Sequence, residues 1–166
     1  MNERNFFENK NELEPEVVTV DQWEGWKKAA SPAIIETTGL GPCIGVVIYD
    51  SDSKQAMVGH FLDPMTGDFS DMLNVAVKTY PDKKNLKIYI GGGAPDPVNA
   101  PSFAYDKEKR NFIKEQLAKH GFQDGQFKIH YQNSDSSTIL RIDTSTGHVE
   151  YDEDVDEYGI EDKNEF

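Results

Sequence analysis

The sequence predicts an α/β fold in which two helices pack on a mixed β-sheet. Residues 43–50, CIGVVIYD, form a nearly continuous apolar and β-branched run, as expected of a strand that is covered on both faces. Residues 68–80 and 106–120 instead repeat apolar side chains at helical spacing. Because strands surround these two helices in the chain order, the simplest arrangement is a sandwich of one mixed sheet with the helices packed on it.

The first expected strands surround a tight hairpin. Residues 33–38, AIIETT, form a short strand, and the strand 43–50 is followed by the turn SDSK at 51–54. Residues 55–64, QAMVGHFLDP, then return as the hairpin partner and end at Pro64.

The first helix, over residues 68–80, ends before Pro81, which cannot continue it. Its apolar residues share one face: Phe69, Met72, Leu73, Ala76, Val77 and Tyr80. Residues 86–93, LKIYIGGG, are expected to form a strand that runs into a glycine loop, and 94–102 is a proline-rich loop.

The second helix, over residues 106–120, has Asp106 in position to be its N-cap and Gly121 just beyond its end. Three further strands complete the expected sheet, and the turn TSTG joins the last two: 126–131, 137–143 and 148–151.

Length and charge fit one domain that binds neither nucleic acid nor membrane. The chain has 166 residues and a formal net charge of −13, so the phosphates of nucleic acid or of an anionic membrane would repel it. No apolar stretch approaches the roughly 20 residues that span a bilayer, and the N-terminus lacks the apolar core of a signal peptide. We therefore expect a cytoplasmic protein, and export by a system that needs no cleavable signal stays open.

The two ends of the chain differ from its centre in composition. Residues 150–166 hold nine Asp or Glu and one Lys, which is −8 of the total charge of −13. Such a segment repels itself, so residues 152–166 are expected to be a disordered tail that solubilises the chain or docks on a basic partner. Residues 1–32 are expected to be a polar, partly ordered arm, with Trp23 and Trp26 on one face of a short helix.

The single cysteine lies where a glycine-punctuated turn enters the most apolar strand. Gly39 and Gly41 let the backbone turn tightly, and Pro42 fixes φ just before Cys43. A side chain that follows such a turn can point into a cleft. If the two strands of the hairpin pair with each other, Cys43 comes within a residue or two of His60 on the neighbouring strand.

A thiol and an imidazole that meet across neighbouring strands can form a thiolate–imidazolium pair, which makes cysteine nucleophilic near neutral pH. Thr37 ends the preceding strand, where a hydroxyl or a carbonyl would orient the imidazole, and Thr38, on the opposite face, is the alternative. Spacing alone favours the simpler interpretation, in which the cysteine is a small buried hydrophobe and the histidine is satisfied within the fold.

No metal, nucleotide or other cofactor is expected. His120, His130 and His148 have no cysteine or carboxylate neighbour at metal-ligand spacing. The glycines at 91–93 lack the Lys-Ser/Thr pair of a phosphate loop, and the chain has no G-x-S-x-G motif of a serine hydrolase.

The segments TTGLGPCIGVVIYD and MVGHFLDP resemble the signature of the CheD family of chemoreceptor glutamine deamidases. In that family a threonine, a glycine-rich turn and a cysteine are followed, after the next hairpin, by a histidine and a proline. The later segments LKIYIGGG, EKRNFIKEQLAKHGF and ILRIDTSTGHVEY are similar to family segments in the same order. The resemblance covers about residues 33–151, which would form a CheD-like catalytic domain. It implies an α/β sandwich that bacterial toxins also use, with the same Cys–His pair, to deamidate glutamines of host proteins.

The resemblance implies a catalytic triad of Cys43, His60 and Thr37, in which the threonine is selected by its position six residues before the cysteine. It places the oxyanion-binding turn at Gly41 and Pro42. Because Pro42 stands where the family usually has a small polar residue and lacks an N–H, the Cys43 N–H is left as a donor for the oxyanion.

The implied activity is that of a cysteine-dependent protein-glutamine deamidase, which hydrolyses glutamine carboxamides through a thioester and needs no cofactor. The implied partners are a protein substrate with an exposed glutamine and, in addition, a regulatory protein. Three alternatives stay open: a catalytically idle CheD-like binding module, a toxin or effector deamidase that acts outside chemotaxis, and a cysteine protease or transglutaminase, which shares the acyl-enzyme step.

Overall fold

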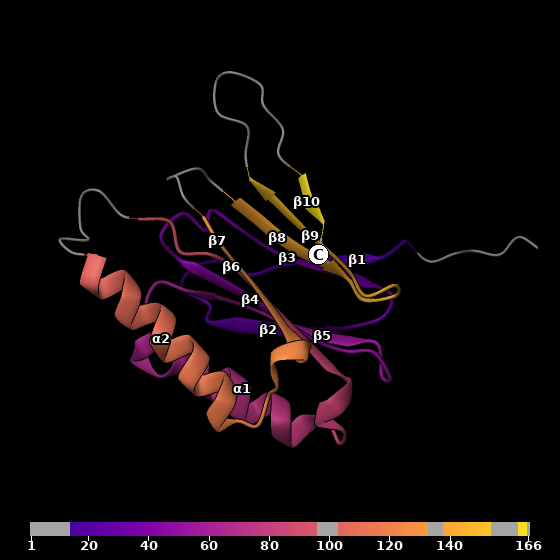
Figure 1. Ribbon diagram of the computed structural model, residues 1–166. Helices are drawn as coiled ribbons and strands as arrows, with labels where there is room; N and C mark the ends of the chain where they lie inside the picture. The colour runs from indigo at the N-terminus through magenta and orange to yellow at the C-terminus, as the bar shows by residue number, and fades with distance from the viewer. Residues whose placement is uncertain (1–13, 96–102, 133–137, 154–162, 166) are drawn as a thin grey trace, which may run out of the picture.

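The computed structural model of the chain describes residues 14–95, 103–132, 138–153 and 163–165. This part contains ten strands, two α-helices and three short 3₁₀ helices, η1 (Pro64–Thr66), η2 (Lys83–Asn85) and η3 (Asp124–Gln126). The predicted α/β class, with two helices packed on a mixed sheet, is confirmed (Figure 1). The strands divide into two five-stranded sheets rather than one.

The first sheet has the strand order β1-β3-β8-β9-β10. Its strands are β1 (Glu16–Thr19), β3 (Ala33–Thr38), β8 (Thr138–Asp143), β9 (His148–Glu153) and β10 (Lys163–Glu165). The β1–β3 pair is parallel and the other pairs are antiparallel.

The second sheet has the strand order β2-β5-β4-β6-β7. Its strands are β2 (Trp26–Ala30), β5 (Gln55–Phe61), β4 (Ile44–Asp50), β6 (Leu86–Gly92) and β7 (Phe127–Tyr131). The β6–β7 pair is parallel and the other pairs are antiparallel. Every residue of the central strand β4 is buried, as its continuous apolar sequence predicts.

Three layers result from this arrangement. One apolar cluster fills the space between the two sheets, with Val47 of β4 and Leu140 of β8 among its members. A second cluster packs Ile48 of β4 against the helices α1 (Asp68–Thr79) and α2 (Phe103–Lys119), which cover the outer face of the second sheet (Figure 1). The two faces of the second sheet are therefore covered by different layers.

Some local predictions are wrong. The segment with Trp23 and Trp26 forms a turn followed by the edge strand β2, not a helix. Helix α2 begins at Phe103, so Asp106 lies inside the helix and is not its N-cap. Gly121 follows the end of α2 with a φ of +86°, as expected of a C-terminal glycine.

The expected disordered tail over 152–166 falls largely on residues 154–162 and 166, which lie outside the described residues. Within the described part, β9 extends to Glu153, and β10 pairs with β9 in antiparallel register.

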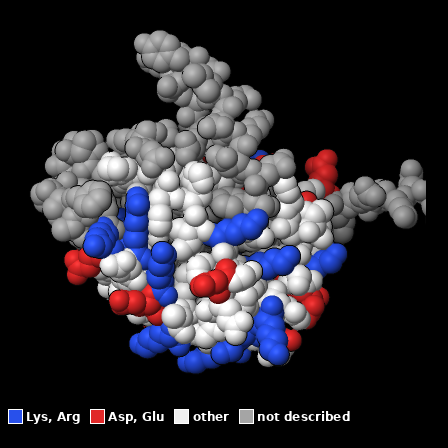
Figure 2. All heavy atoms as spheres, in the orientation of Figure 1, with Lys and Arg blue, Asp and Glu red and all other residues white. Residues whose placement is uncertain are grey.

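The surface of the folded body is less acidic than the whole chain. Figure 2 shows lysine and arginine side chains spread over the helical side in this view, whereas −8 of the net charge of −13 lies in residues 150–166. No helix in the described ranges is long and apolar enough to cross a membrane.

Candidate active site

The turn before β4 fixes the position of Cys43. Gly41 has a φ of +36°, and the turn is closed by a hydrogen bond from the Cys43 N–H to the Leu40 carbonyl (2.5 Å). Gly92 (φ +93°) lies so close that a Cβ there would meet the Cys43 carbonyl oxygen. That carbonyl accepts a hydrogen bond from the Gly93 N–H (2.8 Å), so the end of β6 holds the cysteine backbone in place.

The register of β4 and β5 brings His60 near the cysteine. His60 lies opposite Gly45, and Ile44 lies opposite Phe61. Continued by one position, this register sets Cys43 and His60 two residues apart across the hairpin, within the offset expected from the sequence. Cys43 and His60 are then diagonal neighbours on one face of the sheet. Between their positions, the side chains of Leu40 and Leu140 lie directly over Gly45.

That face is directed toward the first sheet. Val47 and Val58 lie on the same face of β4 and β5, and both pack in the core between the two sheets. Thr37 of β3 meets His60 from the opposite sheet and is fully buried, whereas Thr38 is exposed. The candidate site therefore lies between the sheets, at the end where β4 begins and β5 ends.

Two hydrogen bonds of Thr37 define the tautomer of His60. The Thr37 hydroxyl donates to the Val20 carbonyl at 2.8 Å and lies 2.8 Å from His60 Nδ1. Since the hydroxyl has one proton, and the carbonyl can only accept, the hydroxyl oxygen accepts the second hydrogen bond from Nδ1–H. The neutral imidazole then carries its lone pair on Nε2, which is the form required of a general base.

His60 Nε2 has no hydrogen-bond partner within the described residues, although the side chain is only 3% exposed. A buried acceptor without a donor is costly in a folded protein. The nitrogen is thus available to a donor that lies in, or enters, the site.

Burial favours the neutral form of both Cys43 and His60. It raises the pKa of the Cys43 thiol, an effect that the charge of Lys109 partly opposes. It lowers the pKa of the His60 imidazole, an effect that the Asp21 carboxylate partly opposes. Both shifts disfavour the preformed thiolate–imidazolium pair that the sequence suggests, and the thiol is buried rather than set in an open cleft.

Lys109 of α2 is a feature that the sequence analysis missed. Its ammonium group donates a hydrogen bond to the Pro42 carbonyl (3.1 Å), and the residue is only 7% exposed. It lies four residues before the buried Ile113 and eight before Leu117, so it occupies the apolar face of the helix. A lysine on the apolar stripe of a helix is the signal that could have identified it.

The segment from Val20 to Gly25 is a second feature that was missed. The Val20 carbonyl accepts from Thr37, and the Gly25 carbonyl accepts from the His60 backbone N–H at 2.9 Å. Both contacts use backbone oxygens, which carry no sequence signal. The sequence places this segment in the N-terminal arm, but in the structure it completes the surroundings of the histidine.

The backbone donor that is available next to the cysteine is not the one that the sequence suggests. The Cys43 N–H already donates to Leu40, so it is not available as expected, and Pro42 has no N–H. Within the described ranges the Gly41 N–H has no hydrogen-bond acceptor. Gly41 is therefore the turn residue whose backbone donor remains available next to the cysteine.

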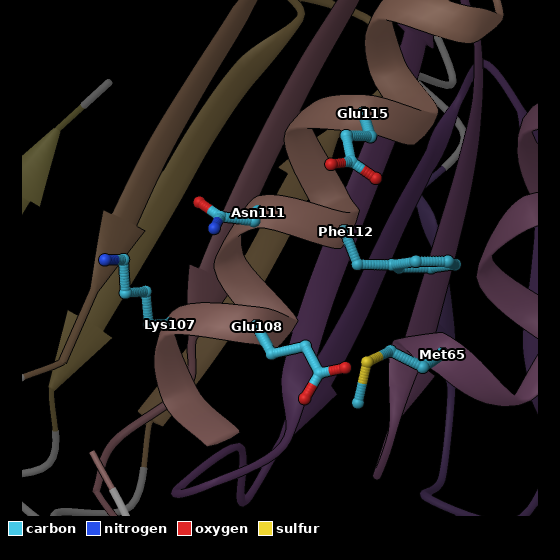
Figure 3. A pocket seen from close by; sticks show the side chains of 6 residues that line it. All are labelled: Met65, Lys107, Glu108, Asn111, Phe112 and Glu115. Carbon is cyan, nitrogen blue, oxygen red and sulfur yellow. The ribbon is translucent and has the colours of Figure 1, made fainter. Parts of the chain in front are cut away.

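One surface pocket of about 250 Å³ is lined by His60 together with Trp23, Leu62 and Asp68, among others. A larger pocket of about 430 Å³ lies between η1 and α2 and is drawn in Figure 3. It is lined by Met65, Lys107, Glu108, Asn111, Phe112 and Glu115 and includes none of the predicted site residues. Among the described residues, no group of three or more His, Cys, Asp or Glu could hold a metal ion.

The chain is similar to curated proteins named probable chemoreceptor glutamine deamidase CheD. The relative from Clostridium botulinum is 32% identical over 111 residues, which cover 57% of this chain and 68% of the relative. The relative from Caldanaerobacter subterraneus is 42% identical over 48 residues, which cover 29% of this chain and 30% of the relative. Other relatives are matched over 35% to 48% of their length.

No protein-family model matches the chain. Among solved structures, the hypothetical protein YfiH of Bacillus licheniformis matches with a TM-score of 0.48 and 15% identity, over 65% of this chain and 50% of YfiH.

Proposed function

The chain belongs to the CheD family, and from this premise we propose that it is a protein-glutamine deamidase with Cys43 as nucleophile, His60 as general base and Thr37 as the residue that orients His60. The relatives carry the name of a chemoreceptor glutamine deamidase, so we propose a chemoreceptor glutamine as the substrate. The chain spans only 30% of the Caldanaerobacter relative, and the activity and partners of the whole relatives come to it as proposals.

The observation that carries the proposal is the Thr37–His60 hydrogen bond of 2.8 Å. Because the Thr37 proton is directed to Val20, Nδ1 of His60 is the protonated nitrogen and Nε2 is the base. That nitrogen is buried and lies on the sheet face that Cys43 shares by register. In a histidine that only fills the core, both ring nitrogens are normally hydrogen-bonded.

In the first step, the Sγ–H proton of Cys43 moves to His60 Nε2 as the sulfur attacks the carboxamide carbon of the glutamine. The C=O π electrons move to oxygen, and the resulting oxyanion is stabilised by the Gly41 N–H and by the charge of Lys109. Thr37 accepts from Nδ1–H throughout, so the imidazolium is oriented by one fixed contact.

In the second step, the imidazolium returns its proton to the amide nitrogen, the C–N bond breaks, and ammonia leaves a γ-glutamyl thioester on Cys43. His60 then removes a proton from water, which attacks the thioester carbon. The C–S bond breaks, the thiol is re-formed with the proton from His60, and the product is glutamate. No electrons are transferred to or from the protein, and no cofactor takes part.

The neutral resting state favours proton transfer during attack over a preformed ion pair. Burial raises the pKa of the thiol and lowers the pKa of the imidazole, so the proton remains on sulfur until the substrate is bound. A buried neutral thiol is also protected from oxidation between turnovers, since oxidants react with the thiolate.

The test is to incubate the protein with the cytoplasmic part of a chemoreceptor and to measure released ammonia, peptide cleavage and cross-linking together. We expect ammonia without cleavage or cross-linking, and we expect Cys43→Ala to abolish its release. Cleavage would indicate a protease, and cross-linking a transglutaminase. If no ammonia is released but the protein binds the chemoreceptor, it is an idle binding module, and if it deamidates only a protein outside chemotaxis, it is an effector deamidase.

A further inference from the structure

Trp23 is unusually exposed for a tryptophan. It lies at the tip of a short turn in which the Glu24 N–H donates to the Asp21 carbonyl (3.0 Å), and 83% of its surface is exposed. Isolated exposed apolar residues are ordinary, but tryptophan is rare on free surfaces and common at the centre of binding interfaces. Trp23 lies beside Leu62, which is 52% exposed and lines the same pocket.

Two adjoining pockets share Trp23. The pocket of about 250 Å³ reaches His60 and Leu62, and a second pocket of about 460 Å³ is lined by Trp23, Glu24, Gly25, Trp26, Asp68 and Asp71. Gly25 and Asp68 also line both pockets. The exposed tryptophan therefore lies between the pocket that reaches His60 and the pocket that is lined by acidic side chains.

Some of the acidic side chains around Trp23 have partners within the described part of the protein, and others do not. Glu24 forms an ion pair with Lys27 (2.7 Å), and Asp63 accepts from the Met65 N–H (2.9 Å). Asp68 and Asp71 lie in the first turn of α1 and are exposed, and neither forms an ion pair with any described residue. Two carboxylates thus remain available to a positive group from outside.

His60 connects this pocket to the proposed active site. Its Nε2 atom is buried, has no hydrogen-bond partner in the described part of the chain, and belongs to a residue that lines the smaller pocket. A volume of about 250 Å³ is below the usual range of roughly 300–1,000 Å³ for cofactor and drug-sized sites. The pocket suits one amino-acid side chain and its backbone rather than a free cofactor.

We propose that the surface formed by Trp23, Asp68 and Asp71 binds a lysine or arginine side chain of the substrate protein. This basic residue would be close in sequence to the glutamine that reaches Cys43. This proposal deepens the deamidase function proposed above and rests on it. The tryptophan face attracts a cation within about 6 Å of its ring, and Asp68 and Asp71 add attraction of the same sign. The site would then select glutamines with basic neighbours and reject those with acidic neighbours.

The expected selectivity is modest, because the groups are exposed and solvent screens them. One cation–π contact and one or two exposed carboxylates together correspond to a preference of roughly threefold to thirtyfold. The carboxylate part of that preference should decrease as ionic strength rises, since the Debye length falls from about 10 Å at 0.1 M to about 3 Å at 1 M salt.

The test uses three acetylated and amidated nonapeptides with a central glutamine, which differ only in having lysine, alanine or glutamate two residues before and after it. Binding of fluorescently labelled peptides to the Cys43→Ala protein is measured by anisotropy at 0.1 M and 1 M salt. We expect the order lysine, alanine, glutamate at low salt. Trp23→Ala and Asp68→Asn should each reduce the preference, whereas the matched surface variants Val17→Ala and Asp124→Asn should retain it.

Equal binding of the lysine and glutamate peptides, or an unchanged preference in Trp23→Ala, would overturn this proposal. Ammonia release by the wild-type protein is measured on the same peptides and tests the deamidase function separately. If ammonia is released equally from all three, the docking proposal fails while the deamidase function stands. If a binding preference is found but no peptide or chemoreceptor releases ammonia, the deamidase function fails, and the proposal that rests on it fails with it.

Discussion

Thr37 contacts His60 directly, and this contact supports its proposed orienting role. Its hydroxyl has one proton and two partners, the Val20 carbonyl and His60 Nδ1. The alternative, Thr38, is one residue along the strand and exposed. In the sequence, a family resemblance favours Thr37, and the structure adds a contact of 2.8 Å between the Thr37 hydroxyl and His60 Nδ1.

Replacing Thr37 by valine should lower kcat by roughly a hundredfold, the lower end of the range for a group that supports proton transfer. Valine keeps the volume but cannot accept from Nδ1–H, so the imidazole loses the contact that fixes its tautomer. Thr37→Ser should retain most of the activity, and Thr38→Ala should behave as wild type. Equal activity of Thr37→Val and wild type, measured by ammonia release, would remove Thr37 from the mechanism.

The pH dependence should report a neutral thiol and a neutral imidazole. Burial lowers the pKa of His60, so the base stays unprotonated below its ordinary pKa of about 6.5 and the acidic limb of kcat/KM should fall below that pH. Burial raises the pKa of Cys43, so alkylation of the free protein by iodoacetamide should rise only above the ordinary thiol pKa of about 8.5. An alkylation rate that is already at its plateau at pH 6 would instead indicate a preformed thiolate–imidazolium pair.

Lys109 should act on Cys43 through its charge. Lys109 opposes the upward shift of the thiol pKa, so Lys109→Met should raise that pKa further, and Lys109→Arg should largely restore it. The midpoint of the alkylation rate against pH is the appropriate measurement, because a purely structural role would change the amplitude or the melting temperature and leave the midpoint in place. An unchanged midpoint in Lys109→Met would show that the charge does not act on the thiol.

At the scale of elements, the site depends on how closely β6 approaches the turn before β4. Gly92 has a φ of +93°, and a Cβ there would meet the Cys43 carbonyl oxygen. Backbone atoms cannot move aside as a side-chain terminus can, so the glycine and the position of the cysteine are coupled.

Gly92→Ala should lower the free energy of unfolding by about 1 to 3 kcal/mol, the usual cost of a residue held in an unfavourable backbone region. It should also reduce deamidation, since the Cys43 carbonyl has to shift. Gly125→Ala is the matched control, because a Cβ at Gly125 meets nothing within 4 Å. Urea unfolding of both variants checks the prediction, and equal stability would show that the turn tolerates a side chain.

The elements differ in how well the sequence predicts them. Strand β4 and helix α1 have strong apolar patterns, and the structure has them over Ile44–Asp50 and Asp68–Thr79. Strand β2, Trp26–Ala30, has the sequence WKKAA without clear alternation, because it is an edge strand in which no residue is fully buried. Its position is set by pairing with β5, which a local pattern does not contain.

For the whole molecule, the sequence predicts the α/β class but not the division into two sheets. Each strand's pattern shows that a face is buried, yet it does not say whether a helix or another sheet covers that face. The outer face of β4 contacts helices and the inner face contacts the first sheet. The site lies between the two sheets, so its surroundings could not be derived from strands counted along the chain.

Only part of the candidate site can be predicted from the sequence. Cys43, His60 and Thr37 have chemistry and spacing that the sequence displays. The carbonyls of Val20 and Gly25 act through backbone atoms that every residue has. Burial, which raises the pKa of Cys43 and lowers the pKa of His60, depends on the packing of the entire fold.

If Cys43 and His60 convert a glutamine carboxamide into a carboxylate, the new carboxylate oxygen comes from water. The decisive experiment is to incubate a chemoreceptor cytoplasmic fragment with the protein in ¹⁸O-labelled water and to map the product peptides by mass. Hydrolysis of a thioester predicts about +3 Da at a glutamine, against about +1 Da in ordinary water, and no shift with Cys43→Ala or His60→Ala. An unchanged mass with the wild-type protein, or a shift that persists in Cys43→Ala, would show that Cys43 does not catalyse this deamidation.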